Sequence, residues 1–257
     1  MNDGKQTSWW SSGTNSRHAG FTLVELAIST FIIALLLGSI LVPLATQVEQ
    51  RQYSDAQKKQ DEIKEALIGF ALANGYLPCP AESAANGQEG SRTAGVCGSR
   101  IGFLPWEALG MPKTDTWGRL YRYSVTPAFT DNTTTPTPVF TLTTTPDIIV
   151  RTRDNTGALI NLTNSSLPTV PAIVISHGTN GYGGTGEQGI AVAPPSPPDS
   201  LAAHPDENTN ATGTTTFVSR SPQAQGASGA GGEFDDVLIW VPRFLLLNRM
   251  IAAGKLP

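Results

Sequence analysis

The sequence predicts an α+β fold in which a long N-terminal helix packs on an antiparallel β-sheet. Two observations support this prediction. The first part of the chain has a helical pattern that begins near Phe21 and ends at the stop signal Asn74-Gly75. After Gly75 the pattern changes to short alternating segments separated by turns, in a chain of 257 residues with 26 Gly and 19 Pro. Only 15% of the residues are charged, which is not the composition of a helical bundle.

The first half of this helix has the composition of a membrane span. No charged residue occurs from Leu26 to Ala45. At 1.5 Å per residue this stretch covers the bilayer core of about 30 Å. A cleaved secretory signal fits less well, because its apolar stretch is shorter and does not lead directly into a charged helix. We therefore expect a single membrane span over 21–45.

The second half of the helix, 46–74, has the pattern of a helix that lies on a soluble domain. Charged residues are dense from Glu49 to Glu65. Ile63, Leu67 and Ala71 then form an apolar stripe at helical spacing, with Phe70 beside it. One helix is therefore expected to run from about Phe21 to Ala73, half in lipid and half on the folded domain.

Glu25 interrupts the apolar pattern near its start. A carboxylate inside a membrane span costs a few kcal/mol unless it is paired, so such a residue is a functional candidate. The surrounding residues 17–26, RHAGFTLVEL, resemble the type IV prepilin motif of pilins and type II secretion pseudopilins. That motif has Gly before a cleavage site, a hydrophobic residue after it and Glu as the fifth residue of the processed chain. Here these residues are Gly20, Phe21 and Glu25.

The resemblance implies a processing and assembly pathway. A prepilin peptidase would cut between Gly20 and Phe21, and the new amine of Phe21 would be methylated and keep its charge. The amine of a neighbouring subunit would then neutralise Glu25, so that the pair sets the register of assembly. Gly38 and Pro43 fall where pilin helices loosen in the filament, although an ordinary membrane-helix proline explains Pro43 equally well.

Two features of the remaining chain agree with an extracytoplasmic domain. Cys79 and Cys97 flank a Gly- and Ala-rich stretch, and outside the cytoplasm we expect them to form a disulfide rather than two buried thiols. The segment 115–123, DTWGRLYRY, resembles the D-x-W-G-x-x-Y-x-Y stretch that follows the helix in major pseudopilins. Some of those proteins hold calcium in an acidic loop. Asp115, Asp131 and the Asp235-Asp236 pair are candidates here, but we assign no metal site and no cofactor.

The pattern of the domain predicts several strands and a final helix. Tyr121, Tyr123 and Val125 alternate as one face of a strand. The long stretch 185–232 has little apolar periodicity and is predicted to be a surface excursion. The residues after Pro242 predict a short helix that stops at Gly254. Further strands are predicted at 139–143, 147–152, 172–176 and 236–241.

Three patterns that suggest other functions are weak. Residues 181–186 match G-x-G-x-x-G, but the prolines that follow do not allow the helix that a dinucleotide site needs. Ser176 and His177 are adjacent on a predicted strand, so their side chains point to opposite faces and cannot act together. The net charge of −4 argues against nucleic acid as a partner, and the two Cys and three His lack the spacing of a zinc site.

The resemblance to type IV prepilins implies a structural subunit, a pseudopilin or minor pilin, and not an enzyme. By the same resemblance it would sit in a bacterial inner membrane with a cytoplasmic N-terminus and a periplasmic domain, and would enter a type IV pilus-like or type II secretion filament. Its partners would be prepilin peptidase, other subunits and assembly platform proteins. Two alternatives remain, a tip subunit that binds a surface or DNA and an anchored periplasmic enzyme. The predicted parts are a leader 1–20, a transmembrane segment 21–45, a soluble helix 46–74 and a β-rich domain 75–257.

Overall fold

A computed structural model describes residues 20, 22–163, 169–192, 204–224 and 229–257, with the side chains of 39–45 not described. The chain divides into two compact units, Met1–Glu49 and Gln50–Pro257. The helix α1, Leu23–Asn74, belongs to both units. It confirms the predicted long helix to within two residues at its start and one at its end. Gly75 ends it with a φ of +87°, a conformation that favours glycine.

The second unit is built on a four-stranded antiparallel sheet in the order β11-β8-β5-β3. These strands are Val237–Val241, Ala172–Ser176, Arg122–Val125 and Ile101–Phe103. A second sheet has the order β10-β6-β7, from Thr216–Val218, Ile149–Arg153 and Leu159–Asn161, with β10 parallel to β6. Two small sheets pair β1 (Arg92–Thr93) with β2 (Val96–Cys97) and β4 (Arg119–Leu120) with β9 (Thr185–Gly186). The shorter helices are α2 Trp106–Leu109, η1 Pro127–Phe129, α3 Pro205–Thr212 and α4 Arg243–Ala252.

One face of the four-stranded sheet packs against the part of α1 that belongs to the second unit. Successive residues of a strand point to opposite faces, and Tyr123 and Val174, which lie directly opposite each other in register, share this face. Both form one buried cluster with the predicted stripe of α1, which includes Ile63 and Leu67. Leu246 and Met250 of α4 belong to the same cluster. The predicted helix-on-sheet arrangement is therefore confirmed.

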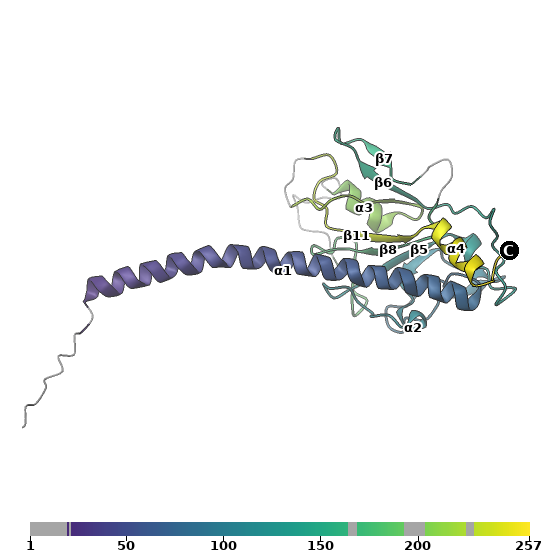
Figure 1. The fold of residues 1–257 in the computed structure, drawn as a ribbon, viewed down its shortest axis with the longest axis horizontal. Helices are drawn as coiled ribbons and strands as arrows, with labels where there is room; N and C mark the ends of the chain where they lie inside the picture. Colours follow the sequence, from purple (N-terminus) through teal and green to yellow (C-terminus); the bar gives the residue numbers. More distant parts are fainter. Residues whose placement is uncertain (1–19, 21, 164–168, 193–203, 225–228) are drawn as a thin grey trace, which may run out of the picture. The chain divides into compact units, whose positions relative to one another are not determined.

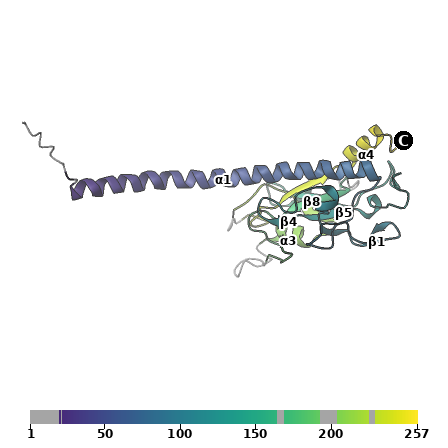
Figure 2. The same ribbon diagram turned by 90° about the horizontal axis from the view of Figure 1, so that it is seen from below.

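The opposite face of the same sheet packs against the three-stranded sheet. Ile173 and Ile175, which alternate with the residues that face α1, form a second buried cluster with Val150 of β6 and Phe217 of β10. All five residues of β8 are buried, since this strand has a packed layer on both faces. Figures 1 and 2 show the part of α1 that belongs to the second unit on one side of the sheet and α3 on the other.

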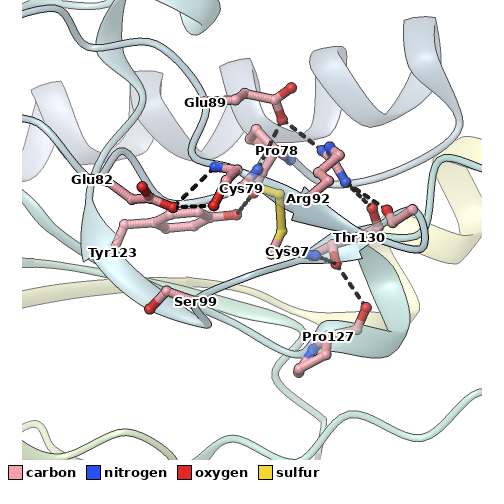
Figure 3. The surroundings of a disulfide bond; sticks show 12 residues. Pro78, Cys79, Glu82, Glu89, Arg92, Cys97, Ser99, Tyr123, Pro127 and Thr130 are labelled. Atoms are coloured by element: carbon pink, nitrogen blue, oxygen red, sulfur yellow. Dashed lines mark hydrogen bonds and ion pairs between the residues drawn. A yellow bond between two sulfur atoms is a disulfide. The ribbon is translucent and has the colours of Figure 1, made fainter.

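The predicted disulfide joins Cys79 and Cys97, with a Cα–Cα distance of 5.4 Å (Figure 3). Glu89 lies beside it and accepts hydrogen bonds from the backbone N–H of Cys79 and from Arg92, both at 2.8 Å. On the other side, the backbone N–H of Cys97 donates to the hydroxyl of Thr130 at 3.3 Å. The bridge closes a loop that contains β1 and ends in β2, which includes Cys97 itself.

The structure corrects two of the predictions for the domain. Residues 139–143 form no strand, and Phe140 instead lies in the core, with its ring 5.0 Å from that of Phe129. The stretch 185–232 is not a surface excursion throughout, because its described part contains β9, α3 and β10. The buried residues of α3 are Asp206, Glu207 and Asn210, so the helix has no apolar stripe for the pattern to detect. The predictions for 147–152, 172–176, 236–241 and the C-terminal helix are confirmed within two residues.

Candidate processing and assembly site

The predicted processing and assembly motif lies just before and at the start of α1. Gly20 is exposed, whereas Phe21 and residues 1–19 lie outside the described part of the chain. The hydroxyl of Thr22 accepts the backbone N–H of Glu25 at 3.2 Å. A side-chain acceptor at this position caps the first turn of a helix, because the first N–H groups have no partner within the helix. The helix therefore begins immediately after the predicted cleavage site.

The Glu25 carboxylate is exposed in the first turn of α1. The hydroxyls of Ser29 and Thr30, one turn further along the helix, donate to backbone carbonyls and not to this carboxylate. Ser29 donates to the carbonyl oxygen of Glu25 itself at 2.7 Å, and Thr30 donates to the carbonyl of Leu26 at 3.0 Å. Among the described residues, none forms an ion pair with Glu25. Within the described part of the chain, the carboxylate is thus exposed and forms no ion pair.

The helix around Glu25 exposes apolar side chains on every side. All described residues from 22 to 38 are exposed, and they include Leu26, Phe31, Leu35 and Leu37, which are 58–65% exposed. Consecutive residues of a helix point in different directions around its axis. The exposed apolar residues therefore surround the helix and do not form one stripe that a single neighbouring element could cover. A helix that is apolar all round requires an apolar environment all round, from lipid or from other helices.

The predicted membrane span is only partly described. Among the residues that the structure describes, no helix is both long enough and apolar enough to cross a membrane. Pro43 is one of the residues whose side chains lie outside the description, while the backbone of α1 is helical through Gly38 and Pro43. Loosening of the helix at these two residues remains a prediction.

The tryptophan-containing motif has a structural role in the second unit. One carboxylate oxygen of Asp115 accepts the backbone N–H groups of Trp117 and Arg119, both at 2.9 Å. The other accepts the hydroxyl of Ser176 at 2.6 Å. The ring of Trp117 makes an edge contact with Tyr53 of α1, with centroids 6.0 Å apart. Asp115 therefore joins the motif to β8, and its oxygens are already used by donors.

The other patterns weighed in the sequence also have structural explanations. Ser176 bonds Asp115, whereas the neighbouring His177 faces Asp236, with Nδ1 3.2 Å from Oδ1, so the two side chains do not meet. The glycine-rich residues 181–186 form turns and the short strand β9. Asp131 accepts hydrogen bonds from the backbone and hydroxyl of Thr133 within its own turn.

Sequence reasoning missed a cluster of carboxylates in which Glu207 of α3 lies beside Asp235 and Asp236. One oxygen of each lies within 4.8 Å of the others. Burial, together with the negative charges of Asp236 and Asp235, raises the pKa of Glu207 to about 8. Burial also raises the pKa of Asp235 to about 6. The Asp235-Asp236 pair was visible in the sequence, but no pattern placed Glu207 next to it.

Comparison with protein families identifies the N-terminal motif. Residues 15–41 match the family described as the prokaryotic N-terminal methylation motif, which is the signal of type IV pilins and pseudopilins. Comparisons with curated proteins and with solved structures found no match. The chain thus carries a pilin-type signal at its N-terminus, which implies processing by prepilin peptidase and a place in a membrane or a filament.

Proposed function

We propose that this chain is a structural subunit, a pseudopilin or minor pilin, of a type IV pilus-like or type II secretion filament. Prepilin peptidase cuts it between Gly20 and Phe21, and the Phe21 amine is methylated. The hydrophobic half of α1 stores the subunit in the inner membrane, with the domain 75–257 on the periplasmic side, and then packs against other subunits. The observation that supports this most directly is the methylation motif at the head of a helix with apolar side chains on all sides.

The arrangement around Glu25 supports its role in setting the assembly register. The hydroxyls of Ser29 and Thr30 are occupied by backbone carbonyls, so they do not compensate the carboxylate. A methylated amine keeps a positive charge and can form a charge-assisted hydrogen bond with a carboxylate. Surrounded by apolar helices, a carboxylate without such a partner is costly, so a subunit that docks out of register is penalised.

Intact-mass spectrometry of the chain co-expressed with a prepilin peptidase tests the processing step. We expect a chain that begins at Phe21 and carries one additional methyl group. The matched control is Gly20→Val, which places a β-branched side chain at the cleavage site and is expected to leave the full-length mass. A processed mass with a different first residue would exclude this function.

A further inference from the structure

A small cavity lies on the face of the four-stranded sheet that α1 does not cover. Its volume is about 250 Å³, and its lining includes Ile101 and Phe103 of β3 and Arg122 of β5. Arg122 lies directly opposite Phe103 and Ile175 in register, and Ile175 belongs to the buried cluster on this second face. His177 also lines the cavity, in agreement with the alternation of side chains along a strand, since it follows Ile175 by two residues. The sheet thus brings an arginine and a histidine to one cavity.

The glycine-rich turn 181–186 forms the wall of the cavity beside His177. Gly183 and Gly184 both belong to the lining. Gly183 has a φ of +73°, and a Cβ at this position would clash with the Cβ of Ala211 in α3. A Cβ at Gly184 would lie 3.2 Å from the Cβ of His177. The lack of side chains therefore lets the turn approach both α3 and the histidine closely.

The imidazole of His177 is 1% exposed and has an unused hydrogen-bonding nitrogen. Its Nδ1 lies 3.2 Å from Oδ1 of Asp236, whose other oxygen accepts the amide of Asn210 at 2.8 Å. Because a carboxylate accepts hydrogen bonds, the proton of the neutral ring lies on Nδ1, and Nε2 is left as an acceptor. Nε2 is buried and has no partner among the described residues. A buried acceptor without a donor is costly, so this atom calls for a donor that the protein does not supply.

Arg122 brings an incompletely bound cation to the same cavity. Its guanidinium donates to the carbonyl of Gly213 at 3.2 Å, whereas its Nε is buried without a partner in the described structure. None of the described carboxylates forms an ion pair with it. Burial lowers the pKa of Arg122, and the charge of Asp236 opposes this shift, although the hydrogen bonds of Asp236 go to His177 and Asn210. A guanidinium with unused N–H groups matches the planar geometry of a carboxylate.

We propose that this cavity binds a small hydroxycarboxylate such as lactate. Arg122 donates to the carboxylate of the ligand, and Nε2 of His177 accepts the proton of its hydroxyl. Ile101, Phe103 and Leu120 line the cavity around the carbon skeleton.

The size of the cavity limits the ligand to a small molecule. Its volume of about 250 Å³ is below the range of about 300–1,000 Å³ that is typical of sites for drug-sized ligands. A carboxylate that lacks the hydroxyl can bind Arg122 but leaves Nε2 without a donor. The hydroxyl is therefore the group that the cavity selects. This proposal does not depend on the role of the chain in a filament.

Binding of two matched acids to the purified full chain in detergent tests the proposal. Lactate and propionate have the same carbon skeleton and the same carboxylate, but only lactate carries a hydroxyl. In saturation-transfer difference NMR we expect lactate to bind saturably in the millimolar range, because so small a ligand makes few contacts. Propionate should bind at least about tenfold more weakly, since it leaves a buried acceptor unpaired. Absence of saturable lactate binding overturns the proposal, and equal affinities overturn the selection of the hydroxyl by His177.

Substitutions at the cavity separate the two contributions. Arg122→Gln removes the cation, so both acids should bind at least about tenfold more weakly. His177→Asn removes Nε2 but keeps an amide that can donate to Asp236. Lactate should then bind only as weakly as propionate, whose own affinity stays the same, and this variant serves as the test if Arg122→Gln does not fold.

The matched control is Arg249→Gln on α4. Arg249 is 54% exposed, and α4 packs on the other face of the sheet, so this variant should bind lactate like the wild type. If folded Arg122→Gln or His177→Asn also binds lactate with the wild-type affinity, the assignment of the site is wrong.

Discussion

The hydroxyl of Ser176 donates a 2.6 Å hydrogen bond to the carboxylate of Asp115, which joins the central strand β8 to the turn that precedes β4. Asp115 is 4% exposed and Ser176 is 0% exposed. The same carboxylate also accepts two backbone N–H groups of its turn. One aspartate thus satisfies three donors, and this explains why the turn depends on an acidic residue at this position.

Replacement of Asp115 should be strongly destabilising. Asp115→Ala leaves three donors without an acceptor in a buried place, so we expect the free energy of unfolding to fall by about 2–4 kcal/mol. Chemical denaturation of the full chain measures this change. Asp55→Ala is the control, since Asp55 is 60% exposed and is expected to change stability by less than about 0.5 kcal/mol. Equal effects of the two substitutions would contradict the buried role of Asp115.

Glu25 is expected to control assembly and not membrane association. Glu25→Gln preserves the shape of the side chain but removes the charge that we propose to pair with an incoming amine. The loss of one partner from a desolvated charge pair costs about 2–5 kcal/mol, so subunit crosslinking should fall at least about tenfold. Membrane-fraction abundance should stay the same or rise, because a costly charge is removed.

The control for this prediction is Glu49→Gln on the same helix. Glu49 is exposed and lies outside the motif, so its substitution should leave crosslinking unchanged. Both variants are co-expressed with the assembly machinery and compared in the same membrane preparation. If Glu25→Gln crosslinks at the wild-type level, the proposed role of this carboxylate in assembly is wrong.

The disulfide should contribute substantially to the stability of the domain. Cys79 and Cys97 are separated by 18 positions, and a bridge across a loop of this length typically contributes about 2–4 kcal/mol. The double substitution Cys79→Ser and Cys97→Ser should lower the unfolding free energy by that amount. A reductant should destabilise the wild type and have no effect on the double variant. If the reductant affects both proteins equally, its action does not depend on the bridge.

The ion pair between Arg100 and Asp147 should make stability depend on acidic pH. The two side chains form paired hydrogen bonds at 2.6 and 2.7 Å. Burial opposes ionisation of Asp147, but the hydrogen bonds from Arg100 and Thr126 outweigh it and lower the pKa of this carboxyl. A lowered pKa in the folded state stabilises the protein above the normal aspartate pKa of about 3.9, and the gain is lost as the pH falls through the folded-state pKa.

Arg100→Gln measures this contribution. The pair is partly exposed, so we expect a loss of about 0.5–1 kcal/mol at neutral pH. The difference between the variant and the wild type should shrink as the pH falls below about 4. Lys58→Gln, which removes an exposed pair with Asp55, should cause little change at any pH. A difference that grows toward low pH would contradict the stated sign.

Sequence analysis predicted well the elements whose burial is visible in the sequence as an apolar run or an apolar stripe. β8 reads as an apolar run because both of its faces are covered, and its bounds match the prediction for 172–176. The stripe of Ile63 and Leu67 likewise identified the face of α1 that packs on the sheet. The start of α1 was predicted because the apolar pattern begins abruptly at Phe21, within two residues of the observed start at Leu23.

The elements that sequence analysis missed are stabilised by polar contacts between distant segments. α3 buries Glu207 and Asn210, whose partners include Asn180 and Asp236 from other parts of the chain. Helical periodicity detects apolar faces and gives no signal for a helix that is buried through hydrogen bonds. The strand predicted at 139–143 does not form, although Phe140 is buried. Its side chain packs in the core from a segment that is not a strand, so burial alone misled the prediction.

The central position of β8 limits how this domain can diverge. Because Ile173 and Val174 face different layers, the insertion of a single residue in this strand would exchange the side chains that face the two layers. The turn between β6 and β7 carries no such restriction, since it joins an edge strand whose residues are exposed. We therefore expect related chains to keep the length of β8 unchanged and to vary in length around residues 154–158.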